Sequence, residues 1–261
     1  VVVVGSEDGN LYAFDASPRN LGSSDADPLL WVFPTGDNIW SGDKIWSTPV
    51  IKDGVAYFGS HNHKIYAVSL DDGTQEWSYA TGGVVAGRPL LFNNLVVAGS
   101  FDKKLYAIDA ATGVLVWQIE ADNWFWAGAV ANDRTIFAAS MDGNIYAVDG
   151  NGGLLWKHDV GAPIVSRPAL VPRGLAVAGK NGKISLLSTN RERQATGREI
   201  SFIFLRDTEV MAPLSASEEA IFVGAQDSTV TRINMSNVRE VWCFDTDTPG
   251  SAVEFRDIRC Q

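Results

Sequence analysis

Apolar and polar residues alternate with a period of two along most of this chain, in short runs separated by polar or glycine-containing turns. A representative pair is the apolar run at 95–99, which ends in a glycine, and the alternating run at 104–109. Two such runs joined by a short polar turn are typical of a β-hairpin. No segment keeps the 3.6-residue apolar period of an amphipathic helix, so the pattern predicts an all-β protein.

The hairpin pattern recurs six times, and each copy ends its first strand on a small residue. These residues are Gly5, Gly59, Gly99, Ala139, Gly179 and Gly224, at intervals of 54, 40, 40, 40 and 45 residues. A short apolar run, often opened by proline, precedes most hairpins, as at 47–51, 87–92 and 166–171. A further strand carrying tryptophan follows most of them. Four strands in a repeat of about 40 residues predict the blade of a β-propeller.

The repeat predicts a single propeller domain spanning residues 1–261. The C-terminal run at 251–258 has the phase of a first blade strand, so residues 251–261 are expected to complete the blade begun at the N-terminus. Six blades in a closed ring are favoured, and part of a seven- or eight-bladed ring is the alternative. The approximate blades are 251–261 with 1–35, then 47–80, 87–120, 127–160, 166–205 and 211–245.

Tryptophans at the repeat period are expected to dock between neighbouring blades. They are Trp31, Trp77, Trp117, Trp156 and Trp242, and Phe202 or Phe204 occupies the corresponding stretch of the fifth repeat. Residues 107–117 carry alanine, aspartate, threonine, glycine and tryptophan at the spacing of the tryptophan-docking motif. On these residues the chain resembles the PQQ-like repeat propellers, a family named after pyrroloquinoline quinone that includes BamB-like envelope proteins, sensor domains and quinoprotein dehydrogenases.

The resemblance implies an extracytoplasmic or periplasmic binding module more than an enzyme. The family's dehydrogenases hold the quinone against a disulfide between adjacent cysteines above a calcium site. The only cysteines here, Cys243 and Cys260, are not adjacent. We therefore expect no catalytic residues, no cofactor and no bound metal.

The charge of the chain narrows the choice of partners. With 21 basic and 31 acidic residues its net charge is −10, which disfavours nucleic acid and anionic membrane surfaces. No apolar run is long enough for a transmembrane helix. The sequence begins at Val1 without an initiator methionine, which is expected of a processed protein, a domain or a fragment. A targeting segment would be lost together with the missing N-terminal part of such a chain.

Polar residues that could carry chemistry fall mainly in the hairpin turns. His61 and His63 have a spacing that can bind zinc or copper, but no further ligands accompany them, so a solvated turn is the favoured interpretation. Aspartates recur at one phase of the turns, at Asp8, Asp102, Asp142 and Asp227. Repetition at one phase indicates a turn requirement rather than a catalytic site.

The loops that connect one blade to the next carry the candidate binding residues. Aromatic side chains gather in two of these loops, and arginines expected to be at least half-buried precede prolines in two others; the candidates are Trp40, Trp46, Trp124, Trp126, Arg88 and Arg167. Apolar residues stand at matching phases, at Val85, Ile164, Val165, Val210 and Met211. The set forms either an interface rich in hot-spot residue types or part of the packing between blades. Trp40 and Trp124 favour the interface, because the other repeats have no counterpart.

The sequence thus predicts a non-enzymatic scaffold whose loop-rich face binds a protein or peptide, in bacterial envelope assembly or as an accessory subunit. A ligand-sensing propeller domain of a larger signalling protein, with a small molecule in the central funnel, is the first alternative. A quinoprotein-type enzyme is the second.

Overall fold

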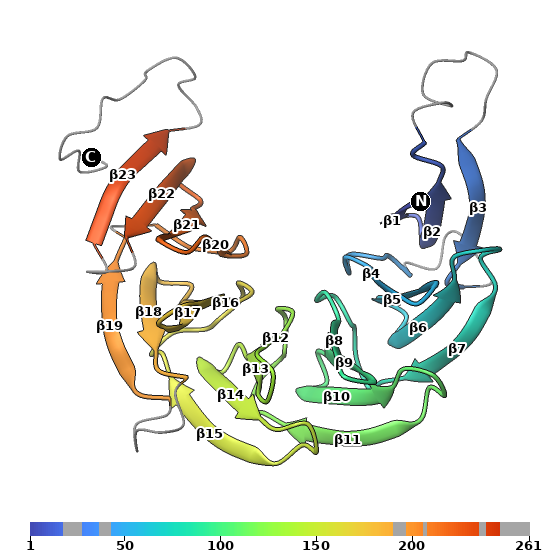
Figure 1. Cartoon of the computed structure of the whole chain (residues 1–261), viewed down its shortest axis with the longest axis horizontal. Coiled ribbons are helices and arrows are strands. Elements are labelled where there is room, and N and C mark those ends of the chain that lie inside the picture. The colour runs from blue at the N-terminus through green and yellow to red at the C-terminus, as the bar shows by residue number, and fades with distance from the viewer. Residues whose placement is uncertain (18–27, 37–42, 190–196, 206–207, 235–238, 246–261) are drawn as a thin grey trace. The chain divides into compact units, whose positions relative to one another are not determined.

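The computed structural model describes residues 1–17, 28–36, 43–189, 197–205, 208–234 and 239–245. The described residues form six antiparallel sheets and contain no helix, which confirms the all-β prediction (Figure 1). They divide into two compact units, Val1–Trp126 and Ala127–Gln261, which are considered separately below.

The first unit contains three sheets whose strands follow one another in chain order. The first sheet has three strands, β1 (Val2–Gly5), β2 (Asn10–Phe14) and β3 (Leu29–Pro34). The second has four, β4 (Val50–Lys52), β5 (Val55–Gly59), β6 (Lys64–Ser69) and β7 (Gln75–Ala80). The third comprises β8 (Leu90–Phe92), β9 (Leu95–Gly99), β10 (Lys104–Asp109) and β11 (Leu115–Glu120).

The second unit repeats this four-stranded pattern three times. Its first sheet comprises β12 (Val130–Ala131), β13 (Ile136–Ala139), β14 (Asn144–Val148) and β15 (Leu154–Asp159). The next comprises β16 (Ala169–Val171), β17 (Gly174–Ala178), β18 (Lys183–Leu187) and β19 (Glu199–Phe204). The last comprises β20 (Ser215–Ala216), β21 (Ala220–Gly224), β22 (Thr229–Asn234) and β23 (Arg239–Asp245).

The middle strands are buried on both faces because sheets pack face to face within each unit. In β6 the four residues Ile65 to Val68 are all buried, although successive side chains point to opposite faces. One core, between the second and third sheets, contains Tyr57, Ile65, Trp77, Val96 and Tyr106. The last strands β11 and β19 alternate between half-buried and exposed positions instead. Stacked four-stranded sheets of this kind are those of a propeller.

The small residue that ends the first hairpin strand is required by the following loop. A Cβ atom added at Gly5, Gly59 or Gly99 would collide with Ile45, Val85 or Phe125 respectively. Each of these apolar side chains comes from the next inter-sheet loop and is buried. The repeated small residue therefore marks a close approach of two segments rather than a turn.

The predicted closure of the first blade by residues 251–261 lies outside the described residues. The first sheet has the three strands assigned to the N-terminus, and the blade number and boundaries stay predictions.

Candidate functional site

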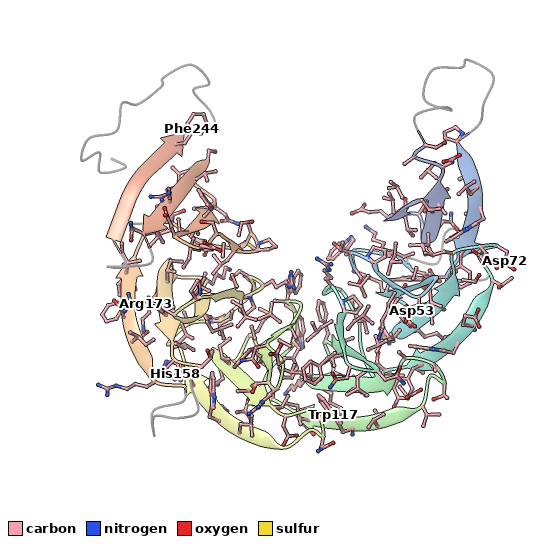
Figure 2. All side chains as sticks on the ribbon, viewed as in Figure 1. Asp53, Asp72, Trp117, His158, Arg173 and Phe244 are labelled. Carbon is pink, nitrogen blue, oxygen red and sulfur yellow. The ribbon has the colours of Figure 1, made fainter. Side chains whose placement is uncertain are left out.

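The tryptophans of the repeat occupy one register position in successive sheets. Trp31, Trp77, Trp117 and Trp156 pair with Ala13, Ala67, Ala107 and Ala147, and in each sheet a bulge follows that alanine. Figure 2 shows Trp117 on β11. The backbone of Trp242 has the same position opposite Arg232. A bulge increases the local twist of the strand, and here it recurs beside every one of these tryptophans.

Three of the tryptophans, Trp31, Trp77 and Trp156, each lie on the turn of the next sheet in their own unit. The indole Nε1–H of Trp31 donates to the Leu70 carbonyl at 2.9 Å, and that of Trp77 donates to the Ala110 carbonyl at 2.9 Å. A Cβ atom on Gly73, Gly113 or Gly197 would lie 2.7 Å from an atom of Trp31, Trp77 or Trp156. These glycines also have positive φ, so the turn both requires glycine and leaves room for the ring.

The fifth sheet departs from this arrangement. The residue that stands before the bulge on β18 is Leu186, and its partner on β19 is Ser201. Phe202 and Phe204 lie on the corresponding strand, as the sequence indicates, but neither takes the tryptophan position. They point to the other face of the strand, where both are 52% exposed and their rings make an edge contact at 5.8 Å. The spacing of the other repeats does not reveal this position, because the paired residues Leu186 and Ser201 are fifteen residues apart where Ala107 and Trp117 are ten apart.

The repeated aspartates hold the hairpin turns. The side chains of Asp8, Asp102, Asp142 and Asp227 each accept a bond from the backbone N–H two residues later. In three repeats the second carboxylate oxygen also accepts from a tyrosine hydroxyl, at 2.7, 2.6 and 2.6 Å from Tyr12, Tyr106 and Tyr146. Burial, the bond to Asp102 and the charge of that carboxylate raise the pKa of Tyr106. These tyrosines were not predicted as partners of the aspartates, although they recur four residues after three of the four.

Five aromatic side chains gather at one end of the sheets of the first unit, and we call them the aromatic patch: Trp46, His61, Phe101, Trp124 and Trp126. The Trp46 ring lies 4.2 Å from that of His61 and 6.3 Å from that of Trp126, between centroids. Phe101 is stacked on Trp124 at 4.7 Å and on Trp126 at 4.9 Å. Trp46 is 45% exposed and Trp124 is 40% exposed. The rings come from four different loops, yet they form one continuous surface.

Backbone hydrogen bonds between these loops hold the patch. The hairpin turn of one sheet is bonded to the inter-sheet loop beside it: His61 N–H donates to the Lys44 carbonyl, and Phe101 N–H donates to the Val84 carbonyl. Phe125, between Trp124 and Trp126, is fully buried and donates its N–H to the Ser100 carbonyl. Trp124 on one side of this buried residue is exposed, and Trp126 on the other side is half-buried.

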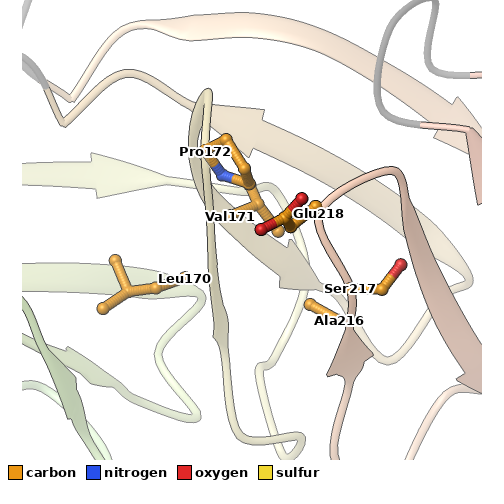
Figure 3. A pocket seen from close by; sticks show the side chains of 6 residues that line it. All are labelled: Leu170, Val171, Pro172, Ala216, Ser217 and Glu218. Carbon is orange, nitrogen blue, oxygen red and sulfur yellow. The ribbon is translucent and has the colours of Figure 1, made fainter.

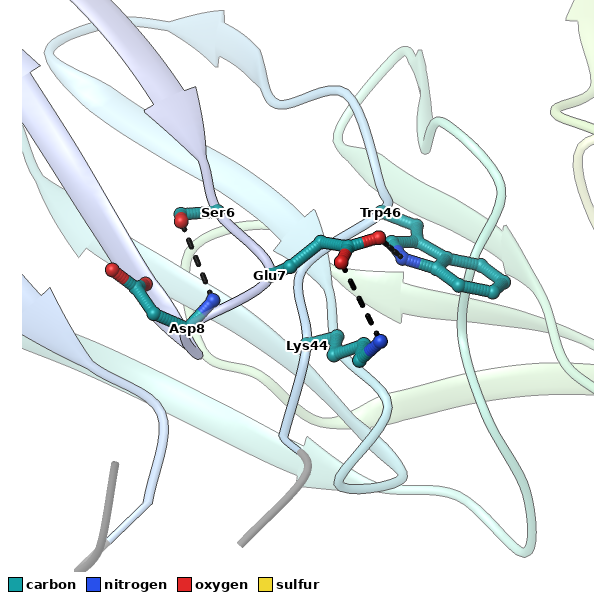
Figure 4. A network of polar contacts seen from close by, with 5 residues as sticks. All are labelled: Ser6, Glu7, Asp8, Lys44 and Trp46. Carbon is teal, nitrogen blue, oxygen red and sulfur yellow. Dashed lines mark hydrogen bonds and ion pairs between the residues drawn. The ribbon is translucent and has the colours of Figure 1, made fainter. Parts of the chain in front are cut away.

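A charged pair borders the patch. The indole Nε1–H of Trp46 donates to one carboxylate oxygen of Glu7 at 3.2 Å, and Lys44 Nζ lies 3.5 Å from the other oxygen (Figure 4). The Lys44 ammonium is also 5.9 Å from the centre of the Trp46 ring. Glu7, His61 and Phe101 were not predicted as partners of the tryptophans. The sequence feature that could have identified them is their shared position, directly before the aspartate or asparagine of the hairpin turn.

The other predicted binding residues divide into buried and exposed ones. Val85, Ile164, Val165 and Val210 are buried core residues, whereas Met211 is 40% exposed. Arg167 is half-buried, and its Nε lies 3.4 Å from the Ala129 carbonyl oxygen. Arg88 is exposed, so the expectation that both arginines are at least half-buried was wrong for it. Trp40 lies outside the described residues.

His61 is the member of the aromatic patch with a titratable ring. Burial, the charge of Lys44 and that of His63 lower the pKa of His61, while Glu7 acts in the opposite direction. These effects favour the neutral form of the ring, which packs against Trp46. Among the described residues no three His, Cys, Asp or Glu side chains are placed to hold a metal.

A separate hollow of about 420 Å³ lies in the second unit (Figure 3). It is lined by β16, β20 and the turns that follow these strands, with the residues Leu170, Val171, Pro172, Ala216, Ser217 and Glu218. The Ser217 hydroxyl is already bonded to the backbone of Ala220. Specific small-molecule sites need several convergent polar groups, and this lining supplies few.

The corresponding loops of the second unit carry no such patch in the part that the structure describes. At the position of Lys44 stands Glu209, which pairs with Lys180 at 3.4 Å, and at the position of Trp46 stands Met211. The patch is therefore a feature of the first unit and not of the repeat.

In the PQQ-type repeat β-propellers, a tryptophan of one sheet packs on a glycine in a turn of the next sheet. The geometry described above places this protein in that class. Residues 7–242 match the family described as outer membrane protein assembly factor BamB, and the chain belongs to this family. Among solved structures, BamB from Moraxella catarrhalis superposes with a TM-score of 0.74 at 20% identity, over 93% of this chain and 69% of that one. A computationally designed protein, Ika8, gives a TM-score of 0.73 at 18% identity, over 92% of this chain and 70% of its own.

These likenesses establish the propeller fold, which fits a protein-binding or scaffold role. No curated protein matches the chain. The part of the chain that the structure describes has no helix that would reach across a lipid bilayer.

Proposed function

We propose that this chain is a non-enzymatic scaffold that binds a protein partner through the aromatic patch and acts outside the cytoplasm, in outer-membrane protein assembly. Membership of the BamB family supports both the proposed role in outer-membrane protein assembly and the proposed location outside the cytoplasm. The observation that carries the binding site is the exposure of Trp46 and Trp124 within a five-ring surface held by rigid sheets.

Physical reasons favour this surface as an interface. Tryptophan is enriched among hot-spot residues because it contributes a large contact area and loses few rotamers on binding. Loops fixed on a rigid scaffold lose little conformational entropy when they bind. Scattered apolar residues are normal on a protein surface, but a continuous group of exposed rings is typical of a binding site.

The enzymatic alternative has little support in the residues. The two cysteines are seventeen positions apart in sequence, at 243 and 260, and cannot form the vicinal disulfide that the family resemblance associates with quinone. The turn aspartates are occupied by backbone and tyrosine donors, which is a structural role.

The proposal is tested by site-specific photo-crosslinking in the cell envelope of the source organism. A benzoylphenylalanine in place of Trp124 is expected to form adducts with outer-membrane assembly proteins, identified by mass spectrometry. The matched control carries the same group at Val116, an exposed apolar position on β11 away from the patch. Absence of adducts at Trp124, or the same adducts at Val116, would count against the patch.

The ligand-sensing alternative has its own measurement. Thermal unfolding of the purified chain with quinones, sugars and divalent ions would show a raised melting temperature if one of them binds the folded state selectively. An unchanged melting temperature across this panel agrees with the scaffold role.

A further inference from the structure

We propose that the aromatic patch recognises a cationic side chain, an arginine or lysine, in an extended basic segment of its partner. The inference rests on the proposed function and specifies which chemistry the patch binds. It is carried by the joint position of Glu7 and Trp46, which place a carboxylate against the edge of an exposed indole.

The site already holds a cation of the chain itself. Lys44 Nζ lies 3.5 Å from Glu7 and 5.9 Å from the Trp46 ring centre, within the range of both an ion pair and a cation–π contact. The Glu7 side chain is nevertheless 70% exposed and that of Lys44 is 39% exposed. Exposed ion pairs contribute little to stability, so a partner's cation can displace Lys44 at small cost.

The surrounding rings favour arginine in particular. Trp46 and Trp126 are tilted by 49° at 6.3 Å, and Trp126 continues into the stacked pair of Phe101 and Trp124. A planar guanidinium stacks on such faces while its N–H groups bond a carboxylate, and it is more weakly hydrated than an ammonium. The net charge of −10 also attracts a basic segment at long range.

The test measures binding of two peptide probes to the whole purified chain by calorimetry at low salt. A short arginine homopeptide amide is expected to bind roughly fivefold or more tightly than the citrulline peptide of the same length, which keeps the length and planar end group but lacks the charge and some of the N–H donors. Equal binding of the two peptides would overturn the inference.

Variants distinguish the patch from general charge attraction. Glu7→Gln and Trp46→Leu should each weaken binding of the arginine peptide about threefold to tenfold, and Lys44→Met should strengthen it. The matched control is Glu76→Gln, which removes an exposed carboxylate on β7 and changes net charge as Glu7→Gln does. An equal effect of Glu76→Gln, or no gain with Lys44→Met, would contradict the site. Far-UV circular dichroism checks that each variant is folded.

The two proposals fail separately. Crosslinks at Trp124 together with equal arginine and citrulline binding would retain the scaffold and remove the cation site. Arginine-selective binding without crosslinks would retain the cation site and remove the proposed partner surface in assembly.

Discussion

Individual residues of the repeat are constrained by what they touch in the next sheet. Gly113 lies in the turn that follows β10, with φ of 72°, and the ring of Trp77 covers it. The turn also needs Asp109, whose carboxylate accepts from the backbone and hydroxyl of Thr112. Glycine is therefore required twice at this position, once by the backbone and once by the tryptophan.

These two requirements can be separated by substitution. Gly54 has a similar φ of 79° but nothing within 4 Å of an added Cβ atom. Gly54→Ala should lower the free energy of unfolding by about 1 kcal/mol, from backbone strain alone. Gly113→Ala should lower it by a further ~1–3 kcal/mol, because the ring must move. Urea unfolding measures both, and an equal loss would mean that the tryptophan contact is unimportant.

The tyrosine of the hairpin predicts a response to alkaline pH. The pKa of Tyr106 is raised in the folded state, so folding favours its neutral form. Its contribution to stability is present below pH 10, the ordinary tyrosine value, and is lost as pH rises above it. Tyr106→Phe should flatten the fall in unfolding free energy above pH 10. An unchanged pH profile would show that the bond to Asp102 does not govern this titration.

The last strand of a sheet can pack on the next sheet with one face and meet solvent with the other, as β7 does. One face of β7 carries Trp77, which packs on the third sheet, and the other carries Glu76 and Ser78, which are exposed. β19 differs on both faces, with Ser201 at the tryptophan position and Ile200, Phe202 and Phe204 exposed. The repeat therefore tolerates replacement of its docking residue in one sheet.

Tryptophans of the two kinds should respond differently to truncation. Trp77 is 8% exposed, and Trp77→Ala should lower the free energy of unfolding by about 3–5 kcal/mol through the cavity it leaves. Trp124→Ala should lower it by only about 1 kcal/mol, the value of its stacking on Phe101. Chemical unfolding followed by circular dichroism compares them. Similar losses for the two would place Trp124 in the core rather than in a binding surface.

Acidic side chains dominate the behaviour of the molecule as a whole. With a net charge of −10, long-range attraction to a basic partner is expected to weaken as salt is added. Turn carboxylates are stabilised in the charged form. Hydrogen bonds from Thr74 lower the pKa of Asp72, and those from Thr112 lower the pKa of Asp109.

This distribution predicts a loss of stability in acid. A carboxyl group whose folded pKa is depressed contributes stability above its unfolded value, and the contribution is lost as pH falls through the folded pKa. The free energy of unfolding should therefore fall as pH drops below about 4. Asp109→Asn keeps one acceptor oxygen and should reduce that fall. Urea unfolding at neutral and acid pH measures the difference, and an identical slope in the variant would contradict it.

The sequence by itself determined the strands, the hairpins and the docking tryptophans. Each depends on local chemistry: the two-residue period of a strand, the side-chain bonds of an aspartate turn, and a fixed spacing from alanine to tryptophan in one repeat. The same pattern recurs at residues 95–117 and 135–156, so a departure from it in one copy can be recognised by comparison with the others. The fifth repeat does not follow this spacing, because extra residues lie between its second hairpin strand and its last strand: Leu186 and Ser201 are fifteen residues apart, where Ala107 and Trp117 are ten apart.

Only the tertiary structure decided which residues share a surface. More than a hundred positions of sequence separate Glu7 from Trp124. These residues share a surface with Trp46 and His61 because hydrogen bonds join the loops of successive sheets. It also decided that Val85 is buried while Arg88 is exposed, since burial depends on the neighbouring sheet. Local patterns carry the backbone conformation, whereas the composition of a surface depends on packing between segments distant in the chain.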